Sequence, residues 1–179
     1  MVVLKRGVGL SQLVKMVHDL LRERSKLAET SPLAKEDGGL DTTRKNLEAA
    51  LQPGALKLFA QPIVRAGEPG GTPFAYEALL RPQGQHFAHV GELLQAVEHF
   101  ATFHELGDQV FALASDLIVQ IPESSRLFIN LHPNQLAGRG RLLSGLERLI
   151  PHASRVVMEI TERGILPEGW ESSVEQLKE

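Results

Sequence analysis

Short apolar runs alternate with longer stretches of helical periodicity through much of this 179-residue chain, and this alternation constrains the fold more than any other feature. The runs at 126–131 and 155–160 are almost continuously apolar, as expected for strands that are covered on both faces. Helical periodicity occupies 90–101, 104–120 and 134–149. Strands that alternate with helices predict βαβ units and a largely parallel sheet.

Two further strand runs lie earlier, at 56–64 and 73–80, and residues 66–72 between them are rich in glycine and proline. A short, turn-rich connection of this kind predicts a hairpin-like pair of strands. Another helix is predicted at 170–178, after the break at Pro167-Glu168-Gly169. The predicted fold class is therefore α/β.

The first 40 residues are predicted to form a helical extension and a linker. Apolar residues recur with helical spacing over 10–29, which predicts an amphipathic helix that packs on the chain or forms a coiled coil with another polypeptide. Residues 30–40 combine proline, glycine and charge without periodicity, as linkers do. A helix is expected to begin at Asp41 or Thr42. We therefore assign 1–40 to the extension and 41–179 to the α/β domain.

Composition excludes several classes of protein. The net charge of −3 argues against a nucleic-acid-binding surface, which is usually basic, so no DNA or RNA partner is expected. The chain has no cysteine, which rules out disulfides and thiolate metal ligands and fits a cytoplasmic location. No apolar run approaches the roughly 20 residues of a membrane-spanning helix, so no membrane span is expected.

Four polar residues stand inside or at the ends of strand runs: Gln61, Glu77, Asn130 and Glu159. Alternate residues of a strand face opposite ways, and these four can share one face, which would be the interior of a barrel. They lie at or towards the carboxyl ends of their strands, where parallel α/β folds place active sites. Two carboxylates and an amide oxygen suit Mg²⁺ or Mn²⁺ better than Zn²⁺. The sequence therefore predicts a hard-cation site that also takes a phosphate substrate.

Each candidate residue also has a structural interpretation. Glu77 could be a strand residue that faces solvent, and Asn130 could form a turn at the end of its strand. Glu162 could cap the segment that follows or pair with Arg163. His132 could point into the mouth of a pocket or be a partly buried, hydrogen-bonded histidine. These alternatives stay open from the residues alone.

Four motifs stand in order along the predicted strands: Gln61-Pro62-Ile63-Val64, Glu77-Ala78-Leu79-Leu80-Arg81, Asn130-Leu131-His132-Pro133 and Glu159-Ile160-Thr161-Glu162. With these motifs, the segment from about 42 to 179 resembles the first half of an EAL domain, the family of cyclic di-GMP phosphodiesterases. The resemblance implies a TIM-like (β/α) barrel of EAL type and metal-dependent hydrolysis of cyclic di-GMP to the linear dinucleotide pGpG.

The resemblance also implies a role for each matched residue. The ligands of Mg²⁺ or Mn²⁺ would be Glu77, Asn130 and Glu159. Glu77 would also act in catalysis, supported by Glu162. The substrate-binding residues would be Arg81, on a phosphate, and Gln61, on a guanine edge.

A complete barrel of this type needs about 250 residues, and residues 42–179 supply about half of that. The family's later elements, an Asp-Asp-Phe-Gly-like strand, a lysine strand and a late glutamate, do not occur up to Glu179. We therefore expect an incomplete barrel and negligible phosphodiesterase activity from this chain alone. An open sheet edge invites pairing, so a homo-oligomer or a partner protein is expected to cover it, unless the 10–29 helix does so. The alternative function is a non-catalytic module that binds cyclic di-GMP or a protein.

Overall fold

The computed structural model describes residues 37–67, 70–137, 139–161, 163–164 and 166–176. The chain divides into two compact units, Met1–Thr42 and Thr43–Glu179, and of the first unit only residues 37–42 are described. The helix predicted at 10–29 lies outside the described residues. The sections below concern the second unit, and the domain boundary at residue 40 stays a prediction.

Helix α2 (Asp37–Ala50) begins four residues before the start predicted at Asp41. The linker prediction was therefore wrong for residues 37–40. Glycine lowers helix propensity by about 1 kcal/mol relative to alanine but does not forbid a helix, so Gly38 and Gly39 can lie in the first turn of α2. Leu47 and Ala50 of this helix are buried.

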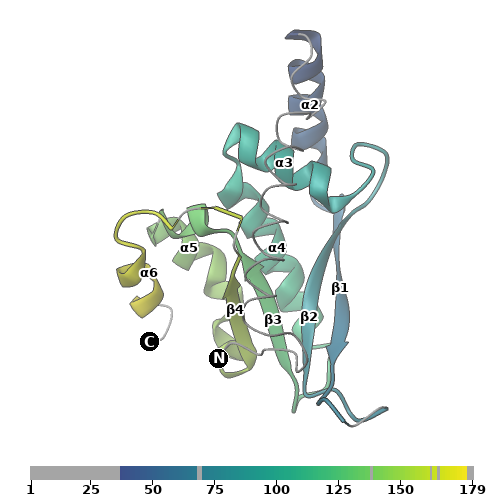
Figure 1. The fold of residues 1–179 in the computed structure, drawn as a ribbon, viewed down its shortest axis with the longest axis vertical. Coiled ribbons are helices and arrows are strands. Elements are labelled where there is room, and N and C mark those ends of the chain that lie inside the picture. Colours follow the sequence, from purple (N-terminus) through teal and green to yellow (C-terminus); the bar gives the residue numbers. More distant parts are fainter. Residues whose placement is uncertain (1–36, 68–69, 138, 162, 165, 177–179) are drawn as a thin grey trace, which may run out of the picture. The chain divides into compact units, whose positions relative to one another are not determined.

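Four strands form one sheet in the order β1-β2-β3-β4, as Figure 1 shows. β1 and β2 pair antiparallel, whereas β2, β3 and β4 are parallel. This arrangement confirms the predicted α/β class and the hairpin that precedes the parallel strands. The strands are β1 (Leu56–Ile63), β2 (Ala75–Pro82), β3 (Arg126–Leu131) and β4 (Val156–Ile160).

The helical segments connect the parallel strands, as the periodicity predicts. The single helix predicted at 134–149 is instead three pieces, two of them 3₁₀ segments. His132 Nδ1 accepts a hydrogen bond from the Asn134 amide, and Gln135 Oε1 accepts one from the His132 amide, so side chains fix a tight turn where the periodicity suggested a regular helix. The segments are α3 (Val90–Phe100), α4 (Phe103–Ile118), η2 (Pro133–Ala137), α5 (Arg139–Leu146), η3 (Glu147–Arg155) and α6 (Trp170–Gln176).

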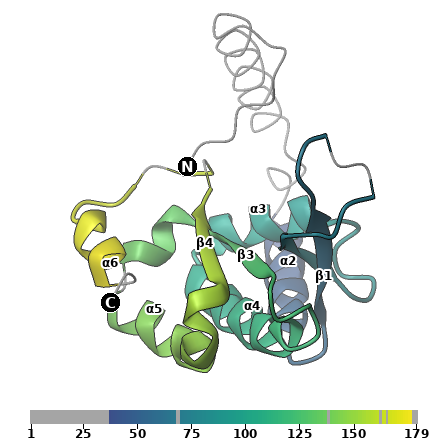
Figure 2. The ribbon, with the colours of Figure 1, turned by 90° about the horizontal axis from the view of Figure 1, so that it is seen from below.

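The main hydrophobic core lies between one face of the sheet and helix α4 (Figure 2). Leu127 and Ile129 of β3 and Phe111 and Ile118 of α4 are 2% exposed or less. A second cluster joins α2, α3 and the upper part of β1 and β2. No helix among the described residues is long and apolar enough to cross a membrane.

The Arg155 guanidinium hydrogen-bonds to backbone carbonyls at the lower end of the core. Its Nε donates to the carbonyl of Ser125 at 3.1 Å, and its Nη2 approaches the carbonyls of Ile118, Ile121 and Pro122 at 3.2, 3.4 and 2.9 Å. The carbonyls at the end of α4 have no partner within the helix. A single guanidinium therefore ties the end of α4 to the entrances of β3 and β4.

The opposite face of the sheet is open in the described part of the unit. The helices that the structure describes pack on the core face (Figure 2), and Phe59 on the open face is 57% exposed. The strand register places the residues predicted to face a barrel interior on this open side. The fold is therefore α/β and similar to part of a TIM barrel, and its open face carries the candidate site.

Candidate functional site

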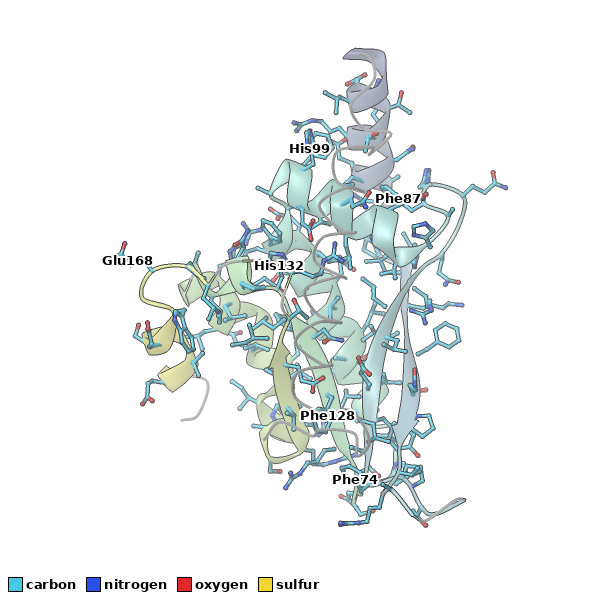
Figure 3. All side chains as sticks on the ribbon, viewed as in Figure 1. Phe74, Phe87, His99, Phe128, His132 and Glu168 are labelled. Carbon is cyan, nitrogen blue, oxygen red and sulfur yellow. The ribbon has the colours of Figure 1, made fainter. Side chains whose placement is uncertain are left out.

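The strand register brings the predicted residues into two neighbouring rows on the open face. Gln61 lies directly opposite Glu77, and Glu77 is beside Phe128. Asn130 pairs with Glu159, two residues further along β3 than Phe128. Because alternate residues share a face, all four candidates project to the same side, Asn130 and Glu159 one row above Glu77. Figure 3 shows the direction of β3, with Phe128 low on the strand and His132 at its upper end.

Asn130 and Glu77 are in direct contact. Asn130 Nδ2 donates a hydrogen bond to Glu77 Oε1 at 3.0 Å. The amide oxygen of Asn130 and the second carboxylate oxygen of Glu77 both remain acceptors. The bond therefore orients the two side chains so that their free oxygens can serve one cation.

Glu159 completes the group of oxygens. Its pKa is raised, first by partial burial and second by the negative charge of Glu77. A carboxyl group whose pKa is raised by a neighbouring negative charge lies where a cation is favourable. Among the described residues no group of three His, Cys, Asp or Glu side chains could hold a metal ion, so this part of the chain offers two carboxylates and one amide.

This donor set fits Mg²⁺ or Mn²⁺. Mg²⁺ in proteins is held by one or two carboxylates and completes its octahedron with waters and substrate phosphates. Glu77, Asn130 and Glu159 supply oxygen only, on strands that the main-chain hydrogen bonds of the sheet hold side by side.

Arg81 and Lys57 face each other at the upper end of the β1–β2 pair. The Arg81 guanidinium donates to the carbonyl of Leu80 at 2.8 Å, its side chain is exposed, and no ion pair joins it to a carboxylate in the described part of the chain. Two cationic side chains on the same face as the oxygen ligands, further along β2 than Glu77, suit an anionic ligand such as a phosphate.

The expectation that the candidates lie at or towards the carboxyl ends of their strands was wrong for Glu77, which is the third residue of β2. Gln61 is near the carboxyl end of β1, but β1 runs antiparallel to β2. The carboxyl end of β1 therefore lies beside the amino end of β2, and Gln61 is at the level of Glu77, far from Arg81. Glu162 lies outside the described residues.

A polar cluster beside the site was not predicted as a group. His132 is stacked on Phe103 with ring centroids 4.4 Å apart, and its Nε2 is 3.8 Å from Glu98 Oε1. Arg163 Nε donates to the same Glu98 oxygen at 2.8 Å. Burial among these side chains lowers the pKa of His132, against the attraction of Glu98. Of the two interpretations of His132 that the sequence left open, the structure supports the partly buried, hydrogen-bonded histidine.

The Glu98–Arg163 pair joins helix α3 to the turn after β4. Arg163 follows Glu159 by four residues, and its partner is 65 residues away in sequence. The turn is also held from the other side, where the Thr161 amide donates to the carbonyl of Leu131 at 3.0 Å. Sequence spacing gives no signal for a contact between elements so far apart.

Comparisons with known proteins agree with this architecture. The EAL domain family matches residues 44–179. The structure of PaMucR phosphodiesterase, a c-di-GMP complex, is similar at 26% identity and a TM-score of 0.61, over 76% of this chain and 59% of that chain. No curated protein sequence matches.

Two further structures share the fold at lower identity. An EAL domain protein from Listeria monocytogenes matches at 19% identity and a TM-score of 0.57, over 78% of this chain and 53% of that one. The FimX EAL domain of Xanthomonas citri, in complex with c-diGMP, matches at 15% identity and a TM-score of 0.58, over 78% of this chain and 58% of that one. The chain spans between half and three-fifths of the length of these three structures. The family match over most of its length shows that the chain belongs to the EAL domain family.

Proposed function

We propose that this chain binds cyclic di-GMP on the open face of its sheet and contributes part of a metal-dependent site that hydrolyses cyclic di-GMP to pGpG. The observation that carries the proposal is the contact between Asn130 and Glu77, next to a Glu159 carboxyl whose pKa Glu77 helps to raise. These oxygens lie on three adjacent strands of an EAL domain. The PaMucR phosphodiesterase, at 26% identity, is a c-di-GMP complex.

Each residue has a distinct part in this proposal. Glu77, Asn130 Oδ1 and Glu159 would hold Mg²⁺ or Mn²⁺, which would supply Lewis acidity when bound. The hydrogen bond from Asn130 Nδ2 fixes the orientation of Glu77. Arg81 binds a phosphate, because a guanidinium offers a forked pair of donors.

The remaining assignments concern the base and the second carboxylate. Gln61 holds a guanine edge, since its amide provides both a donor and an acceptor. Glu162 supports catalysis beside Glu77. A cytoplasmic location is part of the proposal, in keeping with a chain that has no cysteine.

The open sheet favours a second candidate function, binding without hydrolysis. The described sheet has four strands and brings two carboxylates and an amide to the site. A two-metal hydrolytic site needs more ligands than this. We therefore propose that the chain alone binds the dinucleotide with negligible turnover, and that a second copy or a partner protein covers the open face when hydrolysis occurs.

The test is calorimetric titration of cyclic di-GMP into the purified chain, with and without Mn²⁺, while pGpG is followed by chromatography. Metal-dependent binding without pGpG is the expected result. Glu77→Gln should abolish the Mn²⁺ dependence, because it removes one of two carboxylates. Glu123→Gln, the same change at an exposed glutamate before β3, is the matched control and should bind as the original chain does. Absence of binding in both titrations would refute the proposed function, and rapid pGpG formation would refute the claim of negligible turnover.

A further inference from the structure

Phe59 is an exposed aromatic residue on the open face, on β1 at one end of the strand order. Its side chain is 57% exposed, although phenylalanine is among the residues most often buried. It lies on β1 between Lys57 and Gln61 and pairs directly with Leu79 of β2. No ring or cation–π contact joins it to another residue in the part of the chain that the structure describes. Phe59 belongs to neither of the two hydrophobic clusters that the structure describes.

The strand register fixes how far Phe59 lies from the oxygen ligands. Ala78 pairs with Ile129, so the next step of the same register sets Leu79 beside Asn130. Phe59, Leu79 and Asn130 thus form one row across β1, β2 and β3. Two steps between neighbouring strands separate the ring from Asn130 by about 10 Å. A flat group on Phe59 can therefore belong to the same ligand as a phosphate at Asn130.

Polar groups flank the ring along β1 on both sides. Gln61 follows on the same face, about 7 Å along the strand, and offers a donor and an acceptor. Lys57 precedes it and faces Arg81. The open face thus presents an aromatic surface, an amide at its edge, positive charge above it and the oxygen ligands one to three strands away. These are the groups that recognise a nucleobase joined to a phosphodiester.

Resting on the proposed function, we propose that Phe59 is the surface on which one guanine base of cyclic di-GMP stacks. Stacking leaves the hydrogen-bonding edge of the base free for Gln61, and it places the phosphate towards Asn130 and Arg81. The other occupant to consider is an apolar side chain of a second polypeptide that covers the open face. The two occupants differ in what they require at position 59, since only the base needs an aromatic ring.

The test compares Phe59→Leu with Phe59→Trp by titration of cyclic di-GMP in the presence of Mn²⁺. Leucine keeps an apolar side chain but has no π face, so we expect affinity to fall about five- to hundredfold, the range measured for loss of one base-stacking side chain. Tryptophan should keep the affinity within about threefold. Its fluorescence should be quenched by the ligand, whereas the original chain, whose one tryptophan is Trp170, should show little change.

Two controls separate the possible results. Mn²⁺ affinity and the thermal midpoint should be the same in both variants, since Phe59 contacts neither the oxygen ligands nor the core. If Phe59→Leu binds cyclic di-GMP as the original chain does, stacking is refuted and the proposed function stands. If Phe59→Leu changes the oligomeric state in light scattering while nucleotide affinity is kept, the occupant is a second polypeptide and the proposal is wrong. If the original chain itself does not bind cyclic di-GMP, the proposed function is refuted, and the stacking proposal that rests on it is refuted with it.

Discussion

Replacing Arg155 by methionine removes the guanidinium that ties α4 to β3 and β4 while it keeps a similar aliphatic stem. Nε has one hydrogen and Nη2 has two, so the four carbonyls within 3.4 Å share at most three full hydrogen bonds. Hydrogen bonds to a charged group are worth about 1.5–3 kcal/mol each in net terms. Arg155 is half-buried and one contact is long, at 3.4 Å, so we count only two of the three bonds and assign each a value of about 1.5 kcal/mol, the lower end of that range. The expected loss of unfolding free energy is about 3–4 kcal/mol.

Urea denaturation followed by circular dichroism measures this loss directly. For a chain of this size each kcal/mol lowers the melting temperature by about 2–4 °C, so a fall of about 6–16 °C is expected. Arg148→Met is the matched control, because Arg148 is exposed and makes no hydrogen bond through its side chain within the part of the chain that the structure describes, and it should change stability by less than about 0.5 kcal/mol. A loss below about 1 kcal/mol for Arg155→Met, with an unchanged denaturant slope, would refute the reasoning.

Three further predictions follow from the site and its supports. Gly107→Ala should lower stability by about 1–3 kcal/mol in the same assay, because the added Cβ would overlap the buried Gln135 amide. The pKa of His132 is lower in the folded chain than in the unfolded chain, so the unfolded chain takes up the proton at a higher pH and stability should fall as pH drops below about 6.5. His132→Asn keeps an acceptor for the Asn134 amide and should flatten this pH dependence of the melting temperature. The raised pKa of Glu159 should make Mn²⁺ affinity increase with pH in the acid range, and in Glu77→Gln the pKa of Glu159, followed by NMR titration, should move back towards its usual value.

The strands were the most predictable part of the fold. The apolar run at 126–131 coincides with β3, since a strand buried on its core side leaves a strong local signal. The segment after it was not predictable, because η2, α5 and η3 depend on side chains that bond to the backbone. Gln135 bonds to the His132 amide three residues away, and Arg155 bonds to the carbonyl of Ser125 thirty residues away; both side-chain bonds override local helical periodicity.

The candidate site was predictable as a set of residues but not as a geometry. Residue parity indicates that Glu77 and Asn130 can share a face, yet the hydrogen bond between them depends on the register of β2 against β3, which no local pattern gives. The position of Gln61 was not predictable either, because the residue that lies beside it on β2 depends on the direction in which β1 runs. The partner of Arg163 on α3 carries no sequence signal at all.

The topology of the sheet has a consequence for how the chain folds. β1 and β2 are joined by a short loop and form a hairpin, which is a local contact that closes within microseconds. The pairing of β2 with β3 joins Ala75 to Arg126 and must wait until two helices have been enclosed between them, so its loop-closure entropy is larger. Glu77 meets Asn130 only through this slower pairing. We therefore expect the hairpin to be present in the earliest structured states, and the oxygen ligands to come together among the last contacts of folding.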